Sequence, residues 1–236
     1  MKKALIFDLY GTLIDIETDE QAPAVYMNLS RFLSYHLARI KPEDLRKVYN
    51  EYVHKSLAAS NEPYPEVDVF EIFKGIMNKY GPGKYTRSAV RNAAMLFRAL
   101  TIRRFQAFEG IYDVLNLIAK DYKLAIISDA QWLFAEPEMQ MLGLTRYFKT
   151  TIFSSKYGIK KPDIRLFKAA LRRLKVKPDE AVYIGDKPDK DLVGAKKAGM
   201  KCLLFSSVEV SLNGLKPDRQ FADYSELEKI IKELTF

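Results

Sequence analysis

The segment ALIFDLYGTL, residues 4–13, joins four consecutive apolar residues to an aspartate and a glycine-containing loop. An apolar run of this length, followed by turn-forming residues, predicts a short strand buried on both faces. Asp8 is then expected at the carboxyl end of that strand. Open parallel sheets bind their ligands at this edge, near the point where the strand order reverses. The segment therefore predicts a parallel α/β sheet with Asp8 at its binding edge.

Beyond Gly110 the chain alternates regularly between amphipathic and apolar stretches. The predicted helices span 111–120, 133–142, 164–174, 191–198 and 226–234, and the predicted strands span 122–127, 150–153, 181–184 and 200–205. This βα rhythm is typical of a parallel sheet covered by helices on both faces.

Between residues 19 and 102 the pattern changes to long amphipathic stretches without a convincing strand. They predict helices over 22–37, 42–59, 67–80 and 88–100. We therefore expect an α/β fold with a doubly wound parallel-sheet (Rossmann-like) core, formed by residues 1–17 and 104–236. An all-helical insertion, residues 18–103, interrupts the core after its first strand.

The composition is that of a folded globular protein. Hydrophobic residues make up 48% and charged residues 29% of the 236 residues, far from disordered or membrane compositions. No apolar run is long enough to span a bilayer, so no membrane partner is expected. The single cysteine, Cys202, forbids an intramolecular disulfide, and a cytoplasmic location is expected.

The net charge of +8 raises the possibility of nucleic-acid binding, because lysine and arginine neutralise phosphates. The basic residues are scattered in pairs, without a basic tail or a patch interleaved with aromatic residues. We expect a small anionic molecule as the substrate and no nucleic-acid partner. The sequence leaves open whether the chain is a monomer or a homodimer.

Reactive or anion-binding residues follow four of the predicted strands. They are Asp8, Tyr10, Gly11 and Thr12 after the first, Ser128 and Asp129 after the second, Lys161 after the third, and Asp186 and Asp191 after the fourth. Each residue alone has an ordinary structural explanation, such as capping a turn or a helix. Together they supply a carboxylate nucleophile, donors for anion oxygens, a fixed cation and a second carboxylate cluster. These are the parts that phosphoryl transfer requires.

This ordered set resembles the haloacid dehalogenase-like (HAD) superfamily of hydrolases over the whole chain. The stretch Asp8 to Thr12 looks like its first motif, Ser128 its second, Lys161 its third, and Asp186 with Asp191 its fourth. The helical insertion resembles the type-one cap of this superfamily, which closes over the catalytic mouth. The resemblance implies a hydrolase that forms a covalent intermediate on Asp8.

In the phosphatases of this superfamily the intermediate is an aspartyl-phosphate. The resemblance implies Mg²⁺ as the cofactor, held by Asp8, Asp186 and the backbone carbonyl of Tyr10, with Asp191 acting through water. Such a cation would also offset the repulsion within a buried carboxylate cluster. Lys161 would balance the charge between the nucleophile and the phosphoryl group. The candidate substrate contacts of the core are Gly11, Thr12, Ser128 and Asp129.

Tyr10 departs from the phosphatase pattern, which has a second aspartate at this position. That aspartate protonates the leaving group and later activates water, whereas a tyrosine with a pKa of about 10 is a poor base at neutral pH. A catalytic hydroxyl and simple packing under the cap are equally open for Tyr10.

A tyrosine here also looks like the L-2-haloacid dehalogenases, which displace halide without a metal. Arg46 could then resemble their halide-binding arginine, although a surface residue is the simpler explanation. Asp129 and Asp186 depart from the dehalogenase pattern, and Asp186 with Asp191 favours a magnesium site. We therefore predict a Mg²⁺-dependent phosphatase of a small phosphorylated metabolite, with a metal-independent L-2-haloacid dehalogenase as the alternative. A catalytically silent binding protein is a third possibility, disfavoured by Asp8, Lys161, Asp186 and Asp191 together.

Overall fold

The computed structural model describes residues 3–234, and its centre is a six-stranded parallel sheet. Its strands are β1 (Ala4–Phe7), β4 (Lys123–Ser128), β5 (Thr150–Phe153), β6 (Ala181–Gly185), β7 (Lys201–Phe205) and β8 (Arg219–Phe221). They lie in the order β5-β4-β1-β6-β7-β8, so the chain order reverses beside β1. The predicted α/β fold with a parallel sheet is confirmed.

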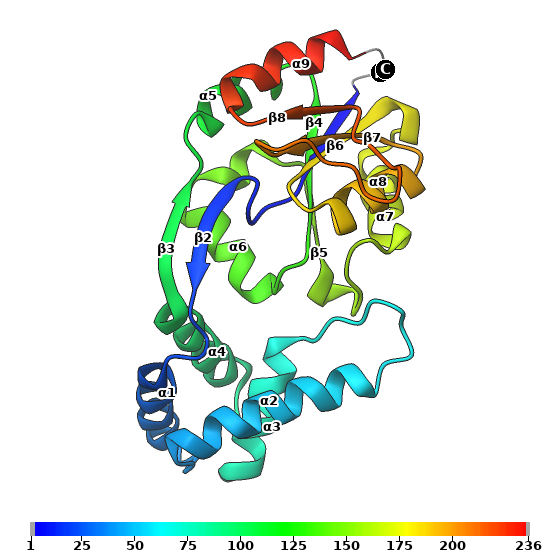
Figure 1. The fold of residues 1–236 in the computed structure, drawn as a ribbon. Helices are drawn as coiled ribbons and strands as arrows, with labels where there is room; N and C mark the ends of the chain where they lie inside the picture. The colour runs from blue at the N-terminus through cyan, green and yellow to red at the C-terminus, as the bar shows by residue number, and fades with distance from the viewer. Residues whose placement is uncertain (1–2, 235–236) are drawn as a thin grey trace.

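Helices cover both faces of this sheet (Figure 1). One face packs against α5 (Ile111–Ile118), α6 (Trp132–Met141) and α9 (Leu227–Glu233), and the other against α7 (Ile164–Leu174) and α8 (Val193–Lys197). Successive side chains of β1 point to opposite faces, with Leu5 and Phe7 in the first layer and Ala4 and Ile6 in the second. All four of these side chains are fully buried, which explains the unbroken apolar run.

Four further helices form a separate bundle below the sheet in Figure 1. They are α1 (Pro23–Tyr35), α2 (Pro42–Ala58), α3 (Val69–Tyr80) and α4 (Arg87–Thr101). The bundle has its own apolar core, in which the rings of Tyr49, Phe73 and Phe97 pack against one another. Leu133 and Phe134 of α6 also belong to this core, so the bundle and the sheet layer share a packed contact.

An antiparallel ribbon joins the bundle to the sheet. It pairs β2 (Ile14–Thr18) with β3 (Ile102–Ala107) and forms the left side of the molecule in Figure 1. The sequence did not predict the strands β2 and β3 of this ribbon or the edge strand β8. All three strands are short and partly exposed. Both predicted boundaries of the helical insertion, 17/18 and 103/104, fall inside the ribbon. No helix within residues 3–234 combines the length and the apolar character that crossing a membrane requires.

Candidate active site at the strand ends

Asp8 directly follows β1 and is only 5% exposed. Its backbone N–H donates to the carbonyl of Ile184 in β6 at 2.8 Å, which continues the sheet pairing and fixes the position of Asp8. Its Oδ1 accepts a hydrogen bond from the backbone N–H of Leu9 at 2.7 Å, and the carboxylate also binds the buried hydroxyl of Ser128. The carboxylate is therefore anchored between β1, β4 and β6.

Lys161 brings a buried cation to Asp8. Its Nζ lies 3.0 Å from Asp8 Oδ1 and 2.6 Å from Asp191 Oδ1, and the side chain is 1% exposed. The same Nζ donates to the hydroxyl of Tyr183 at 3.1 Å. The two carboxylates raise the pKa of Lys161 although burial lowers it, so the ammonium stays charged.

Asp191 is completely buried, and the protein uses both of its carboxylate oxygens. Oδ1 accepts from Lys161 and, at 3.0 Å, from the hydroxyl of Tyr183. Oδ2 accepts from the backbone N–H groups of Asp186 at 3.0 Å and Lys187 at 2.9 Å. Asp191 thus shapes the loop after β6 and orients Lys161.

Asp186 follows β6 and faces the loop after β1. Its Oδ1 accepts a hydrogen bond from the hydroxyl of Thr12 at 3.1 Å, and its Oδ2 pairs with Lys187 Nζ at 2.8 Å. Gly11 has φ +83°, and a Cβ at this position would lie 2.6 Å from Asp186 Oδ2. Only glycine allows both this backbone conformation and the close approach of the carboxylate.

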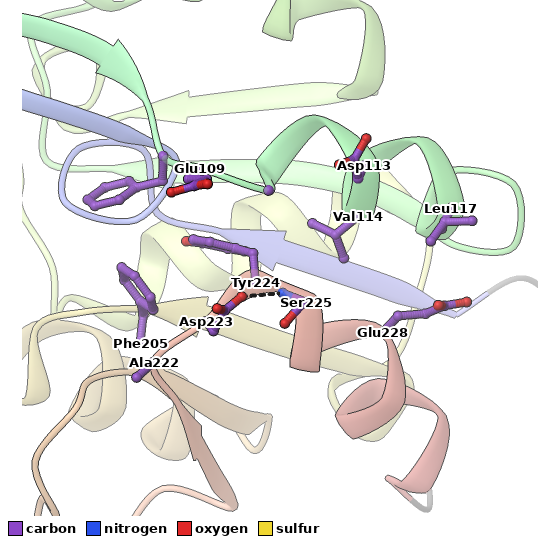
Figure 2. Close-up of a pocket in the computed structure, with 12 residues that line it drawn as sticks. Glu109, Asp113, Val114, Leu117, Phe205, Ala222, Asp223, Tyr224, Ser225 and Glu228 are labelled. Atoms are coloured by element: carbon purple, nitrogen blue, oxygen red, sulfur yellow. Dashed lines mark hydrogen bonds between the residues drawn. The ribbon is translucent and has the colours of Figure 1, made fainter.

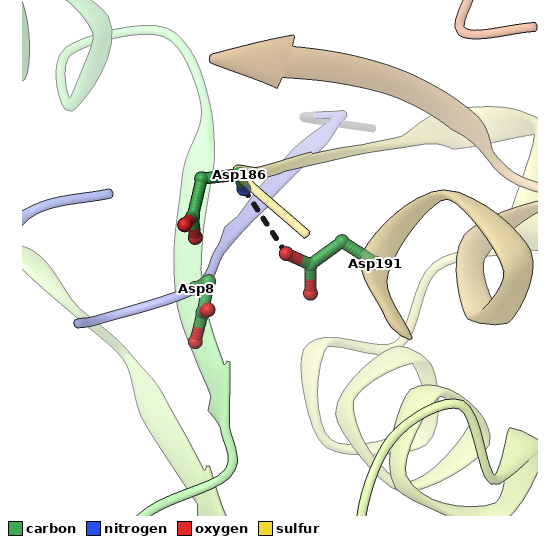
Figure 3. A group of neighbouring side chains, drawn as sticks. All are labelled: Asp8, Asp186 and Asp191. Atoms are coloured by element: carbon green, nitrogen blue, oxygen red, sulfur yellow. Dashed lines mark hydrogen bonds between the residues drawn. The ribbon is translucent and has the colours of Figure 1, made fainter. Parts of the chain in front are cut away.

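Asp8, which follows β1, converges with Asp186 and Asp191, which both follow β6 (Figure 3). Each offers an oxygen, and these oxygens all lie within 4.8 Å of one another. Burial raises the pKa of Asp8 to about 7 and Asp191 adds to the rise, although Lys161 and Ser128 act against it. One buried ammonium for three neighbouring carboxylates leaves excess negative charge, so this chemistry suits a hard divalent cation.

Asp129 lies beside this cluster and holds two loops together. Its Oδ1 accepts from the backbone N–H of Lys161 at 2.8 Å, and its Oδ2 lies 3.2 Å from Lys190 Nζ. Its carboxylate therefore positions the loop that carries Lys161.

Tyr10 does not point its hydroxyl at open space. The hydroxyl donates to Glu138 Oε2 of α6 at 2.5 Å, and Glu138 is 4% exposed. Arg98 of α4 closes the network, because its Nε lies 2.6 Å from Glu138 Oε1 and its guanidinium lies 5.4 Å from the Tyr10 ring centre. Burial and then the Glu138 charge raise the pKa of Tyr10 well above 10. Tyr10, Glu138 and Arg98 form what we call the cap–core triad.

Arg46 lies apart from these residues. It is exposed on α2, its Nη1 is 3.4 Å from the carbonyl of Gln21, and it lines a cavity of about 720 Å³ between α1 and α2. No residue of the strand-end loops lines this cavity. The structure thus brings together all the predicted strand-end residues but does not place Arg46 with them.

Two openings flank the carboxylate cluster. Gly11 and Asp186 line a cavity of about 330 Å³, and Lys161 lines one of about 570 Å³ between the core loops and Tyr64 of the bundle. A third cavity, of about 450 Å³, lies at the start of α5 (Figure 2). Its lining includes the acidic residues Glu109, Asp113, Asp223 and Glu228. This acidic lining would repel an anion, so the third cavity does not suit the anionic substrate that the sequence predicts.

Sequence reasoning did not identify Glu138, Arg98, Tyr183 or Tyr224 as part of the site. Tyr224 lies in the C-terminal segment, and its hydroxyl donates to the carbonyl of Thr12. Glu138, Arg98 and Tyr224 are far in sequence from their partners, whereas Tyr183 lies only eight residues from Asp191, and none of the four belongs to a motif. The pairing of Glu138 with Arg98, in particular, follows only from the packing of α6 against α4.

Comparison with known proteins places these features in context. The family model of haloacid dehalogenase-like hydrolases matches residues 5–205. A glyceraldehyde 3-phosphate phosphatase from Methanothermobacter thermautotrophicus is 33% identical over 50% of this chain, and the match spans 55% of that protein. The chain thus spans about half the length of this relative. A glyceraldehyde 3-phosphate phosphatase from Pyrococcus abyssi is 36% identical, with 87% of this chain and 82% of that protein covered.

A solved structure with the same fold is a 2-haloacid dehalogenase from Pseudomonas syringae pv. Tomato DC3000. It aligns with a TM-score of 0.69 at 22% identity and covers 98% of this chain and 99% of its own. A structural similarity at 22% identity shows a shared fold only. The reaction has to be inferred from the residues of the site.

Proposed function

Since the chain belongs to the haloacid dehalogenase-like hydrolases, we propose that it is a Mg²⁺-dependent phosphatase that forms an aspartyl-phosphate on Asp8. The observation that carries this proposal is the convergence of Asp8, Asp186 and Asp191, with their oxygens within 4.8 Å, beside buried Lys161. Several relatives are named as phosphatases of small phosphorylated metabolites, which supports the same reaction class.

The three carboxylates fit Mg²⁺, which would be bound directly by Asp8, Asp186 and the carbonyl of Tyr10. Asp191 would act through water, because protein donors already occupy both of its oxygens. Bound there, Mg²⁺ would neutralise the carboxylates and the phosphoryl oxygens.

The chain's own residues supply the rest of the proposed reaction. Asp8 attacks the phosphorus atom and Lys161 balances the charge that builds up between the two groups. Ser128, whose hydroxyl binds Asp8, and Thr12, whose hydroxyl binds Asp186, would donate to the phosphoryl oxygens. Gly11 would line the opening beside Asp186, since its backbone N–H already donates to the carbonyl of Ile14. Asp129 acts through the Lys161 loop rather than on the substrate.

The helical bundle, residues 18–103, is proposed to act as a cap over a core made of residues 1–17 and 104–236. Tyr64 of the bundle and Lys161 of the core line the same cavity, which supports substrate binding between the two parts. We further propose a small anionic substrate and a cytoplasmic location, the latter supported by the single, buried Cys202.

A metal-independent L-2-haloacid dehalogenase is the second candidate, favoured by Tyr10 two residues after the nucleophile. The Asp186 carboxylate argues against it, because a negative group facing the loop of Asp8 would repel the carboxylate of a haloacid.

One assay separates the two candidates. The protein is incubated with phosphate esters, acyl phosphates and L-2-chloropropionate, each with Mg²⁺ and with a chelator, and phosphate and chloride are measured. We expect phosphate release that requires Mg²⁺ and is abolished in Asp8→Asn. Chloride release in the presence of chelator would overturn the phosphatase proposal in favour of the dehalogenase.

A further inference from the structure

Resting on the proposed phosphatase function, we propose that the preferred substrates are phosphates whose leaving group departs without a proton, acyl phosphates above all. The groups around Asp8 decide whether a leaving oxygen can receive a proton. A phosphate ester of an alcohol needs such a donor, because an alkoxide is a poor leaving group.

Tyr10 occupies the position, two residues after Asp8, at which the phosphatase pattern has its general acid. Its hydroxyl proton is already engaged, since it donates to Glu138 at 2.5 Å. To protonate a leaving group, the hydroxyl would have to give up this hydrogen bond and leave a phenolate beside a buried carboxylate. Both consequences oppose proton donation.

Arg98 locks this arrangement from the other side. Its guanidinium binds both oxygens of Glu138, with Nε at 2.6 Å from Oε1 and Nη2 at 3.1 Å from Oε2. The Arg98 and Glu138 side chains are 12% and 5% exposed, and Glu138 accepts hydrogen bonds from both Arg98 and Tyr10. The cap–core triad therefore turns the tyrosine away from the reaction.

The other described carboxyl groups near the strand ends are also acceptors. Asp191 accepts through both oxygens, and Asp186 accepts from Thr12 while pairing with Lys187. Glu66, at the edge of the bundle, accepts from the hydroxyl of Ser154 at 2.7 Å and from the backbone N–H of Val67 at 3.0 Å. Asp186, Asp191 and Glu66 are therefore all hydrogen-bond acceptors, and none of the hydrogen bonds described for them within residues 3–234 carries a proton toward Asp8.

An acyl phosphate needs no such proton. Asp8 forms a bond to phosphorus, the bond from phosphorus to the acyl oxygen breaks, and the leaving carboxylate keeps the electron pair. Its conjugate acid has a pKa of about 4, whereas that of an alkoxide lies near the value of about 15.7 for water. Water then cleaves the aspartyl-phosphate, Asp8 leaves as a carboxylate, and the phosphate product retains both protons of the water.

The test compares leaving groups under single-turnover conditions with Mg²⁺. Acetyl phosphate, a series of aryl phosphates and glyceraldehyde 3-phosphate are offered to the protein, and phosphorylation of Asp8 is followed. Because general acids contribute about 10²–10⁴-fold, we expect acetyl phosphate to react at least ~10²-fold faster than glyceraldehyde 3-phosphate. The rates with aryl phosphates should fall steeply as the pKa of the phenol rises.

A pair of variants tests the role of Tyr10. Tyr10→Asp introduces a carboxyl group, and it should narrow the ratio between acetyl phosphate and glyceraldehyde 3-phosphate. Tyr10→Asn introduces a side chain of the same size as aspartate but without an acidic proton. It should leave the ratio between the two rates as large as in the unmodified protein. Equal rates for all leaving groups in the unmodified protein would overturn the substrate class while preserving the phosphatase function. No Mg²⁺-dependent reaction with any phosphate, including acetyl phosphate, would overturn both.

Discussion

Lys161 lies closer to Asp191 than to the proposed nucleophile: its Nζ is 2.6 Å from Asp191 Oδ1 and 3.0 Å from Asp8 Oδ1. The ammonium is thus held mainly by a carboxylate that the protein has already saturated with hydrogen bonds. Its weaker contact with Asp8 can be exchanged for a phosphoryl oxygen without freeing the side chain. This asymmetry would allow one buried lysine both to stabilise the fold and to serve the proposed reaction.

The first prediction concerns Lys161→Met. Removing the ammonium leaves Asp8 and Asp191 buried without their cation, and breaking a buried ion pair in this way costs about 3–5 kcal/mol of unfolding free energy. Urea denaturation in the presence of a chelator measures this loss. The double variant with Asp191→Asn should lose less than the sum of the two single losses, because the unpaired charge is gone. If the two losses of unfolding free energy were strictly additive, an energetic coupling between Lys161 and Asp191 would be contradicted.

The second prediction concerns Gly11→Ala. The new Cβ would meet Asp186 Oδ2 at 2.6 Å, and the left-handed backbone, with φ +83°, adds about 1–2 kcal/mol of strain. We expect weaker Mg²⁺ affinity and at least a tenfold loss of activity, because Asp186 must move away. Gly143→Ala is the matched control, since Gly143 has φ +64° but no atom within 4 Å of the added Cβ. A similar loss of affinity in both variants would show that strain alone, and not the clash, is responsible.

The third prediction concerns the pH dependence of stability through Asp163. This residue caps α7 by accepting from the backbone N–H of Arg165 at 2.9 Å, and hydrogen bonds from Arg165 lower its pKa below the ordinary 3.8, although burial opposes them. Because the folded-state pKa is lowered, its stabilisation is present above pH 3.8 and is lost as the pH falls through the folded value. Asp163→Ala should cost about 1 kcal/mol at neutral pH.

Unfolding curves of the two proteins between pH 3 and 7 measure this effect. The difference between them should stay constant above pH 5 and shrink below pH 4. A difference that grows on acidification would refute the assigned sign.

Most of the sheet, its flanking helices and the strand-end residues could be predicted from the sequence, because local patterns encode them. Four apolar residues before Asp8 demand burial on both faces, and the βα rhythm after Gly110 dictates a parallel sheet. The ribbon of β2 and β3 has no such local signal. Its strands lie more than 80 residues apart in sequence, and it owes its pairing to the closure of the helical bundle between them.

The surroundings of Tyr10 show a second limit of sequence reasoning. Its position two residues after Asp8 left a catalytic hydroxyl and simple packing equally open. The contact that bears on this choice comes from Glu138 and Arg98, which lie 128 and 88 residues further along the chain. A buried carboxylate and its cation can be located only once α4 and α6 are packed together. The contacts of Tyr10 are therefore set by tertiary packing, and they cannot be predicted from the motif in which it lies.

The last prediction is that the aspartyl-phosphate on Asp8 accumulates during turnover. Its hydrolysis is slow without a base for the attacking water, and Tyr10 cannot serve as that base, because burial and Glu138 raise its pKa and keep it protonated at neutral pH. With acetyl phosphate and Mg²⁺ we expect a burst of about one equivalent of phosphoenzyme, followed by slow phosphate release. Rapid acid quenching and mass analysis of the Asp8 peptide would detect it. Tyr10→Asp supplies a base and should diminish the burst, whereas Tyr10→Asn should preserve it. Linear phosphate release without detectable phosphoenzyme would show that water finds another base and that the second step is not limiting.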